Sequence, residues 1–114
     1  MFKAFSHLAI LCAGVSAANA YEVMPVCATY VNSGKTYAVQ ALVASGNELN
    51  SAWNTNVLRG TKNYVVIYWD NDEATVIELS YGTPGLGAAP GEDQKGYPWA
   101  VRRGTFCFDK SPRQ

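Results

Sequence analysis

One stretch of this sequence limits the possible folds more than any other. Residues 64–69 read Tyr-Val-Val-Ile-Tyr-Trp, and a second apolar run, residues 74–81 (ATVIELSY), follows after the polar residues 70–73 (Asp-Asn-Asp-Glu). β-Branched and aromatic residues favour strands, whereas Asp and Asn favour the backbone angles of turns. We therefore expect an antiparallel hairpin that reverses at residues 70–73.

The rest of the chain shows the alternation and turn residues typical of strands, with no long stretch of helical periodicity. The pair Gly46-Asn47 predicts a tight turn between two strands. Residues 82–98 contain five glycines and three prolines and predict a long irregular loop. The other expected strands are Met24–Val31, Thr36–Ser45, Glu48–Trp53 and Trp99–Phe108. Together these elements predict an all-β fold, a small antiparallel β-barrel or sandwich of about six strands.

The first twenty residues have the pattern of a secretory signal peptide. Lys3 precedes the short apolar run Leu8–Val15, and Ala18-Asn19-Ala20 matches the small-x-small pattern of a cleavage site. We expect cleavage before Tyr21, leaving a single β domain over residues 21–114 with a frayed tail at 109–114. The expected location is periplasmic or secreted. The apolar run is too short for a membrane span.

Two cysteines remain once the leader is removed. The leader carries Cys12 and the single histidine, His7, so Cys27 and Cys107 are left without a Cys-x-x-Cys pattern or a histidine to complete a metal site. In an oxidising compartment this pair predicts a disulfide, which contributes about 4–5 kcal/mol in the chain-entropy model. The eight basic and nine acidic residues beyond position 20 give a net charge of −1, which favours neither nucleic acid nor an anionic membrane.

The faces of the terminal strands fit this disulfide. The first strand places its apolar residues at even positions and Cys27 on the opposite face. In the last strand the apolar positions change from odd to even at Gly104, which predicts a β-bulge and leaves Cys107 on the non-core face as well. The disulfide is therefore expected to join the first and last strands outside the core.

Catalytic chemistry has little support in the sequence. Without a histidine or a spare thiol, serine- or cysteine-type catalysis is nearly excluded, and no cofactor motif is present. An enzyme based on a pair of carboxylates remains open, because Glu78 and either Glu92 or Asp93 could divide the roles of acid and base. Residues 70–73 resemble the start of a calcium loop, but the glycine and the distal glutamate of that motif are missing. We therefore expect a turn there, and no metal site.

The predicted hairpin suggests a surface for a partner. If Val66 faces Ile77 and Ile67 faces Val76, both faces of the hairpin are apolar, although a single-layer barrel buries only one. The candidates for an exposed patch are Val65, Ile67, Trp69 and Val76. A homodimer through residues 64–79 is a further option. The alternative is that the loop at 82–98 folds over this face.

Aromatic residues at strand ends form a second candidate surface. Amphipathic rings at such positions often anchor proteins or sugars. The residues of this kind are Trp53, Trp69, Tyr81, Tyr97 and Trp99. Arg102, close to Tyr97 and Trp99, adds a side chain suited to an anion contact, or else a solvated strand edge.

One short motif resembles a known family. Residues 33–37, Ser-Gly-Lys-Thr-Tyr, contain the Ser-Gly-x-x-Tyr pattern and are similar to the inhibitory loop of exported C-type lysozyme inhibitors. Those proteins are also small β-barrels with a disulfide. In this chain the pattern lies early in the mature sequence instead of in its later half, and we do not assign the chain to that family.

These features together favour a binding role. We expect an exported protein that recognises a protein partner, as an inhibitor or immunity-type protein acting on a secreted or cell-wall-active enzyme through a surface or loop. The alternative is a secreted lectin-like or toxin-like module that binds glycans through surface aromatics. A carboxylate-based enzyme is the third hypothesis.

Overall fold

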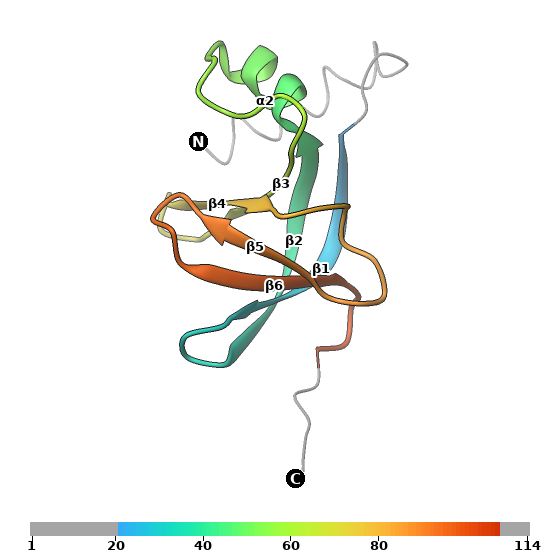
Figure 1. Ribbon diagram of the computed structural model, residues 1–114. Coiled ribbons are helices and arrows are strands. Elements are labelled where there is room, and N and C mark those ends of the chain that lie inside the picture. Colours follow the sequence, from blue (N-terminus) through green and yellow to red (C-terminus); the bar gives the residue numbers. More distant parts are fainter. Residues whose placement is uncertain (1–20, 108–114) are drawn as a thin grey trace, which may run out of the picture.

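The computed structural model describes residues 21–107 of the chain. The expected signal peptide at 1–20 and the expected tail at 109–114 lie outside the described residues. Six strands and one helix make up the fold (Figure 1). They are β1 (Glu22–Tyr30), β2 (Lys35–Ser45), α2 (Gly46–Trp53), β3 (Asn63–Tyr68), β4 (Ala74–Leu79), β5 (Ala89–Asp93) and β6 (Pro98–Arg103).

The strands form a closed antiparallel barrel. Each strand pairs with the next along the chain, and β6 pairs with β1 to complete the ring. The prediction of an all-β fold is confirmed, and of its two alternatives the barrel is the observed one. A ring of this kind leaves no fully free sheet edge, which protects a small β protein from edge-to-edge association.

The barrel interior holds the main core. It is built from inward-facing apolar residues of all six strands, and β1 contributes Met24, Val26 and Ala28 from the face predicted for it. Val65 and Ile67 of β3 are fully buried in this core. The prediction that they belong to an exposed patch is therefore wrong.

The error lies in the register of the hairpin. Val65 pairs with Ile77 and Val66 with Val76, one residue away from the predicted pairing. The connection is longer than expected, because Tyr68 pairs with Ala74 and the Trp69 N–H donates to the Glu73 carbonyl at 2.8 Å. A one-residue shift in pairing changes which face of a strand matches the faces of its partner. The inner and outer residues of β3 are therefore the reverse of those predicted, whereas on β4 Ile77 lies inside and Val76 outside, on the faces expected for them.

Helix α2 covers the outer face of β2 and β3. Leu49 of this helix is 1 % exposed and packs with Leu42, Ala44, Tyr64 and Val66 on the outside of the barrel, with Val76 partly buried against them. The helix, and not the loop at 82–98, thus shields the second apolar face of the hairpin. A homodimer through residues 64–79 therefore lacks the exposed apolar surface expected for it.

The predicted strand at 48–53 is wrong because a helix cap outweighs the turn signal. The Glu48 N–H donates to Ser45 Oγ at 3.1 Å, and the Ser45 N–H donates to the Glu48 side chain at 2.8 Å. This reciprocal pair is a capping box, which satisfies backbone donors at the start of a helix. Its Ser-x-x-Glu pattern begins one residue before the glycine that suggested a hairpin.

The loop predicted at 82–98 contains strand β5. Gly91 pairs with Leu79 on one side and Trp99 on the other. A Cβ atom at this position would lie 2.6 Å from the Glu78 carbonyl oxygen, so glycine allows the close approach of β4. The strand is hard to recognise because glycine and proline replace the usual β-branched residues.

The disulfide forms as predicted. Cys27 on the outer face of β1 is bonded to Cys107, with the two Cα atoms 5.4 Å apart. The last strand is shorter than expected: β6 ends at Arg103, and the Gly104 N–H donates to the Pro25 carbonyl at 3.0 Å. The predicted continuation beyond a bulge at Gly104 is wrong, and Phe106 is 72 % exposed. No helix among residues 21–107 is long and apolar enough to cross a membrane.

Candidate functional site

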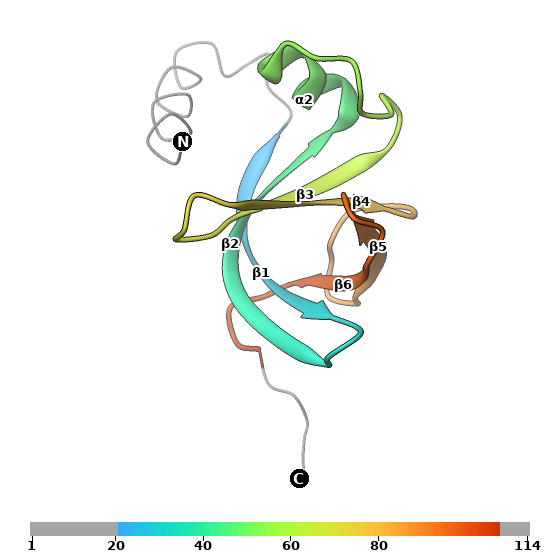
Figure 2. The ribbon, with the colours of Figure 1, turned by 90° about the vertical axis from the view of Figure 1, so that its left-hand side faces the viewer.

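Three turns lie together at one end of the barrel. They join β1 to β2, β3 to β4 and β5 to β6, and all three lie at the left in Figure 1, the side that is turned toward the viewer in Figure 2. This follows from the up-and-down order of the strands, since alternate connections fall at the same end. The opposite end carries α2 and the β4–β5 connection.

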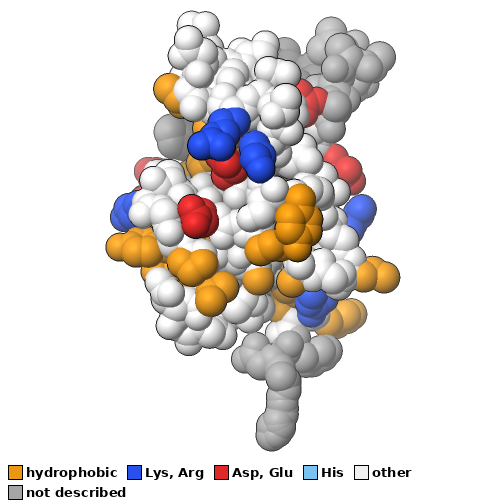
Figure 3. Space-filling model, viewed as in Figure 1, with side chains coloured by type: hydrophobic (Ala, Val, Ile, Leu, Met, Phe, Trp, Pro, Cys, Tyr) orange, Lys and Arg blue, Asp and Glu red, His pale blue; other side chains and the backbone are white. Residues whose placement is uncertain are grey.

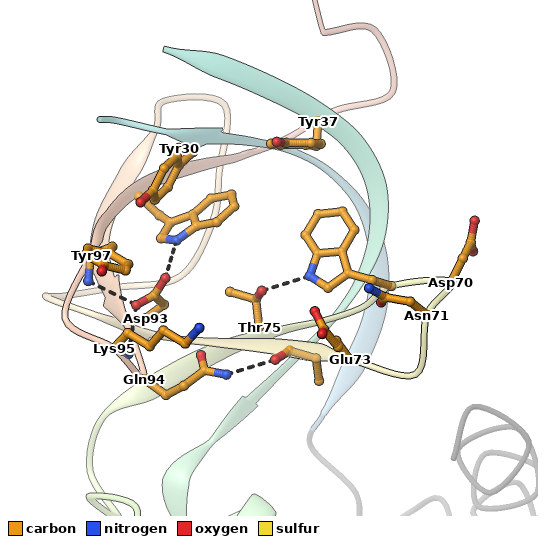
Figure 4. A pocket seen from close by; sticks show the side chains of 13 residues that line it. Tyr30, Tyr37, Asp70, Asn71, Glu73, Thr75, Asp93, Gln94, Lys95 and Tyr97 are labelled. Atoms are coloured by element: carbon orange, nitrogen blue, oxygen red, sulfur yellow. Dashed lines mark hydrogen bonds between the residues drawn. The ribbon is translucent and has the colours of Figure 1, made fainter. Parts of the chain in front are cut away.

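A cleft of about 730 Å³ opens between these turns. Its volume lies within the range of small-molecule binding pockets. The residues that line it are Tyr30, Tyr37, Trp69, Asp70, Asn71, Glu73, Ala74, Thr75, Asp93, Gln94, Lys95, Tyr97 and Trp99. Aromatic rings therefore form much of its wall, and carboxylates and amides lie beside them (Figure 4).

The cleft exists because β2 and β3 separate toward this end. β2 pairs with β1 over residues 35–43, but with β3 only over residues 42–45. Near the turns, side chains connect the two strands instead, and the Tyr37 and Trp69 rings meet edge to face with their centroids 5.3 Å apart. The wall of the barrel is thus opened at its mouth.

The aromatic residues form a continuous series around the mouth. Tyr37 also approaches Trp99 at 6.1 Å, Tyr30 lies 5.2 Å from Trp99, and Tyr30 meets Tyr97 at 6.0 Å. These separations are those of favourable ring pairs. The rings therefore hold one another in place.

Hydrogen bonds fix the two indoles of the cleft. The Trp69 Nε1–H donates to Thr75 Oγ1 at 2.8 Å, and the Trp99 Nε1–H donates to Asp93 Oδ2 at 2.9 Å. The other oxygen of Asp93 accepts the backbone N–H groups of Lys95 and Tyr97, at 2.9 and 3.0 Å. One carboxylate at the end of β5 thus shapes the β5–β6 turn and orients an indole.

The polar side chains of the cleft differ in how far they are engaged. The Gln94 amide accepts from the Val76 N–H and donates to the Ala74 carbonyl, at 2.9 and 2.8 Å, and so holds the β5–β6 turn against β4. The side chains of Asp70 and Glu73 have no hydrogen-bond or ion-pair partner among residues 21–107. Lys35 lies at the rim, with its Nζ 5.4 Å from the centre of the Tyr37 ring.

Three of the predicted partner-binding residues come together here: Trp69, Tyr97 and Trp99. The others do not. Val65 and Ile67 lie in the core, and Val76 is partly buried against the cluster on the outer face. Arg102 lies on the outer wall, where its guanidinium donates to the Phe106 carbonyl at 2.8 Å. A partner-binding role for the three cleft residues stays a prediction.

Two aromatic residues of the site were missed. Tyr30 and Tyr37 flank the β1–β2 turn, and both point into the mouth of the barrel (Figure 4). The alternation of β1 already placed Tyr30 on the face of Met24, Val26 and Ala28, which was the available signal. Tyr37 is also the last residue of the Ser-Gly-x-x-Tyr motif, so that motif borders the cleft.

The carboxylates considered for catalysis lie mainly on the outer wall. Glu78 and Glu92 are partners across β4 and β5 and flank a hollow of about 420 Å³ with Arg59 and Lys62. Tyr64 donates its hydroxyl to Glu78 at 3.0 Å, and burial raises the pKa of this tyrosine above its ordinary value. In Figure 3 charged side chains of both signs meet below the helix, whereas apolar side chains also reach the surface at the left, where the turns lie.

Residues 70–73, three of them acidic, form a turn. Asp72 has a left-handed backbone conformation with φ 65°, which Asp tolerates better than most residues. Among residues 21–107 no cluster of three or more His, Cys, Asp or Glu side chains is placed to hold a metal ion. Residues 70–73 thus reverse the chain between β3 and β4, and Asp70, Asn71 and Glu73 line the cleft beside this turn.

Comparison with known proteins gives no further guide to function: no family model, no curated protein and no solved structure matches this chain.

Proposed function

We propose that this chain is an exported, non-enzymatic binding protein whose site is the aromatic cleft at the barrel mouth. Its partner in this proposal is a protein, such as a secreted or cell-wall-active enzyme that it inhibits or to which it confers immunity. The observation that carries the proposal is the series of aromatic rings, held by hydrogen bonds and ring contacts, around an open cleft.

The physical argument concerns the entropy of binding. Anchoring residues at protein interfaces are often Trp, Tyr and Arg, because their side chains bring large contact areas. Ordering a flexible side chain on binding costs about 0.5–1.5 kcal/mol. Trp69 and Trp99 are already oriented by Thr75 and Asp93, so this cost is small here. A preformed cleft of this kind suits a segment that enters from a partner.

A glycan is the second candidate ligand, and the concave shape of the site favours it. Pyranose rings have an apolar face of C–H groups that stacks on aromatic rings, and hydroxyl groups that bond to carboxylates and amides. The cleft combines Trp69 and Tyr37 with Asn71 and Glu73. This arrangement supports the lectin-like alternative more directly than an exposed flat patch would.

One experiment separates the two candidates. Mature protein and its Trp69→Ala variant are immobilised and exposed to a periplasmic extract, and retained proteins are identified by mass spectrometry. Trp53→Ala is the matched control, because Trp53 lies on α2 and does not line the cleft. The protein-binding proposal expects a specific protein that Trp69→Ala loses and Trp53→Ala keeps.

A parallel titration with monosaccharides and cell-wall fragments, followed by tryptophan fluorescence, tests the glycan. Saturable quenching that disappears in Trp69→Ala, together with unchanged protein capture by that variant, would favour the lectin-like function over the proposed one.

A further inference from the structure

The charges around the cleft are unbalanced. Its lining includes three carboxylates, Asp70, Glu73 and Asp93, and one ammonium group, Lys95. The ion pairs of the described residues join Arg59 to Glu78 and Arg103 to Glu22, both outside the cleft. With Lys35 beside Tyr37 also counted, three carboxylates and two ammonium groups leave a net charge of −1. Asp93 is engaged by three N–H donors, whereas Asp70 and Glu73 have no ion-pair partner among residues 21–107.

The aromatic walls add to this preference. The faces of Trp and Tyr rings carry negative potential and attract cations within about 6 Å of the ring centre. The Lys35 ammonium already lies 5.4 Å from the centre of Tyr37. The Trp99 indole donates its N–H to a carboxylate, and this hydrogen bond increases the electron density of the ring.

We propose that the cleft receives the side chain of an arginine from the protein partner. In this arrangement the planar guanidinium lies against the rings of Trp69 and Tyr37, and its N–H groups donate to the Glu73 carboxylate. Figure 4 shows Tyr30 and Tyr37 on one side of the cleft with Glu73 and Thr75 on the opposite side, so an inserted group contacts both. This inference rests on the proposed function, because it names the chemistry of the partner at the same site.

Arginine fits these contacts better than lysine. A guanidinium is weakly hydrated, stacks on aromatic faces and donates two parallel hydrogen bonds to one carboxylate, whereas an ammonium is a strongly hydrated point charge. Entry into an aromatic cleft removes water from the cation. The loss of hydration is smaller for arginine, and the stacking contact is larger.

The test uses three small probes and mature protein. The probes are the N-acetyl methylamides of arginine, of citrulline, which has nearly the shape of arginine without its charge, and of lysine. Binding is followed by the indole N–H signals in proton–nitrogen NMR spectra. Trp69 and Trp99 report on the cleft, and Trp53 on α2 is an internal control. We expect the arginine probe to bind with a Kd of about 1 mM, as a single side chain can, and to move the two cleft signals only.

Charge and stacking are then tested separately. Citrulline should bind at least about tenfold more weakly than arginine, and lysine should also bind more weakly. Glu73→Gln should weaken arginine binding about fivefold, whereas Glu92→Gln, the same charge change on the outer wall, should leave it unchanged. Equal binding of citrulline and arginine, equal binding of lysine and arginine, or an unchanged affinity in Glu73→Gln would each overturn the inference.

The result also separates this inference from the proposed function. If Trp69→Ala loses a captured protein while Glu73→Gln keeps it, and the arginine probe does not bind, the cleft is a protein-binding site without an arginine pocket. If the arginine probe binds as expected but Trp69→Ala retains every captured protein, the pocket exists and the proposed partner does not use it.

Discussion

Asp93→Asn should destabilise the protein, because it leaves an N–H donor at the barrel mouth without an acceptor. The carboxylate of Asp93 accepts three N–H groups, two from the β5–β6 backbone and one from Trp99. An asparagine has only one acceptor oxygen, so in either orientation of its amide an NH2 group faces an N–H donor. Trp99 is 6 % exposed, and water therefore has little access to the unpaired donor. The lost charge-assisted bond and the unsatisfied donor together cost about 2–4 kcal/mol.

Urea unfolding followed by circular dichroism measures this cost. Asp70→Asn is the matched control. It removes the same charge from the same cleft, but the Asp70 side chain has no partner among residues 21–107. The free energy of unfolding of this variant should remain within about 0.5 kcal/mol of wild type. In a double-mutant cycle, Trp99→Phe removes the indole donor and should show a coupling energy of about 1–2 kcal/mol with Asp93→Asn. Equal effects of Asp93→Asn and Asp70→Asn, or a coupling near zero, would refute the reasoning.

Three further predictions concern the stability of the barrel. Replacing Cys27 and Cys107 by alanine opens a loop with a sequence separation of 80 and should lower the free energy of unfolding by about 4.5 kcal/mol, as measured by urea unfolding against the oxidised protein. Leu49→Ala should cost about 2–5 kcal/mol in the same assay, because it leaves a cavity beneath α2; a cost below about 1 kcal/mol would show that the helix is not an essential cover. Burial raises the pKa of both Tyr64 and Tyr68 in the folded protein. As the pH rises, the two phenols therefore ionise first in the unfolded chain, near pH 10. Their contribution to stability is fully present below that pH and is lost as the pH rises through their folded pKa values. Tyr64→Phe should make the alkaline fall in the unfolding midpoint less steep, and an unchanged slope would contradict this account.

The sequence was sufficient for the fold class but not for the detailed register of the central hairpin. The apolar runs at 64–69 and 74–81 identified two strands, because β-branched and aromatic residues dominate them. The register depends on the length of the turn, and Trp69 could be read either as the last strand residue or as the first residue of the connection. The Trp69 N–H to Glu73 carbonyl bond settles this point and reverses the inner and outer faces of β3 relative to the prediction.

The other errors arose where tertiary contacts outweigh local signals. Gly46-Asn47 has the composition of a tight turn, but Ser45 and Glu48 form a capping box and Leu49 has a cluster to bury. In β5 the sequence has glycine because β4 approaches closely, so the strand lacks the residues by which strands are recognised. Neither contact is visible from a window of a few residues.

The candidate site was recognised in part. The position of Trp69, Tyr97 and Trp99 at strand ends is visible in the sequence, but their convergence follows from the order of strands around the barrel. Asp93 was considered only as an acid for catalysis. Its structural role depends on its distance from an indole six residues later, which sequence spacing does not give.

The division of apolar residues in this barrel explains how a small domain can keep one end open. Val65, Ile67 and their neighbours fill the interior, while Leu49 and Val66 form a second cluster on the outer wall beneath α2, and the disulfide ties the chain after β6 to β1. None of these three features uses the carboxylate of Asp70 or Glu73. A substitution at Glu73 should therefore change binding without unfolding the protein, and one at Asp70 should likewise leave the protein folded, because the groups they remove contribute neither to the core nor to the cover. Asp93 is the exception, since it joins the mouth of the barrel to its last strand.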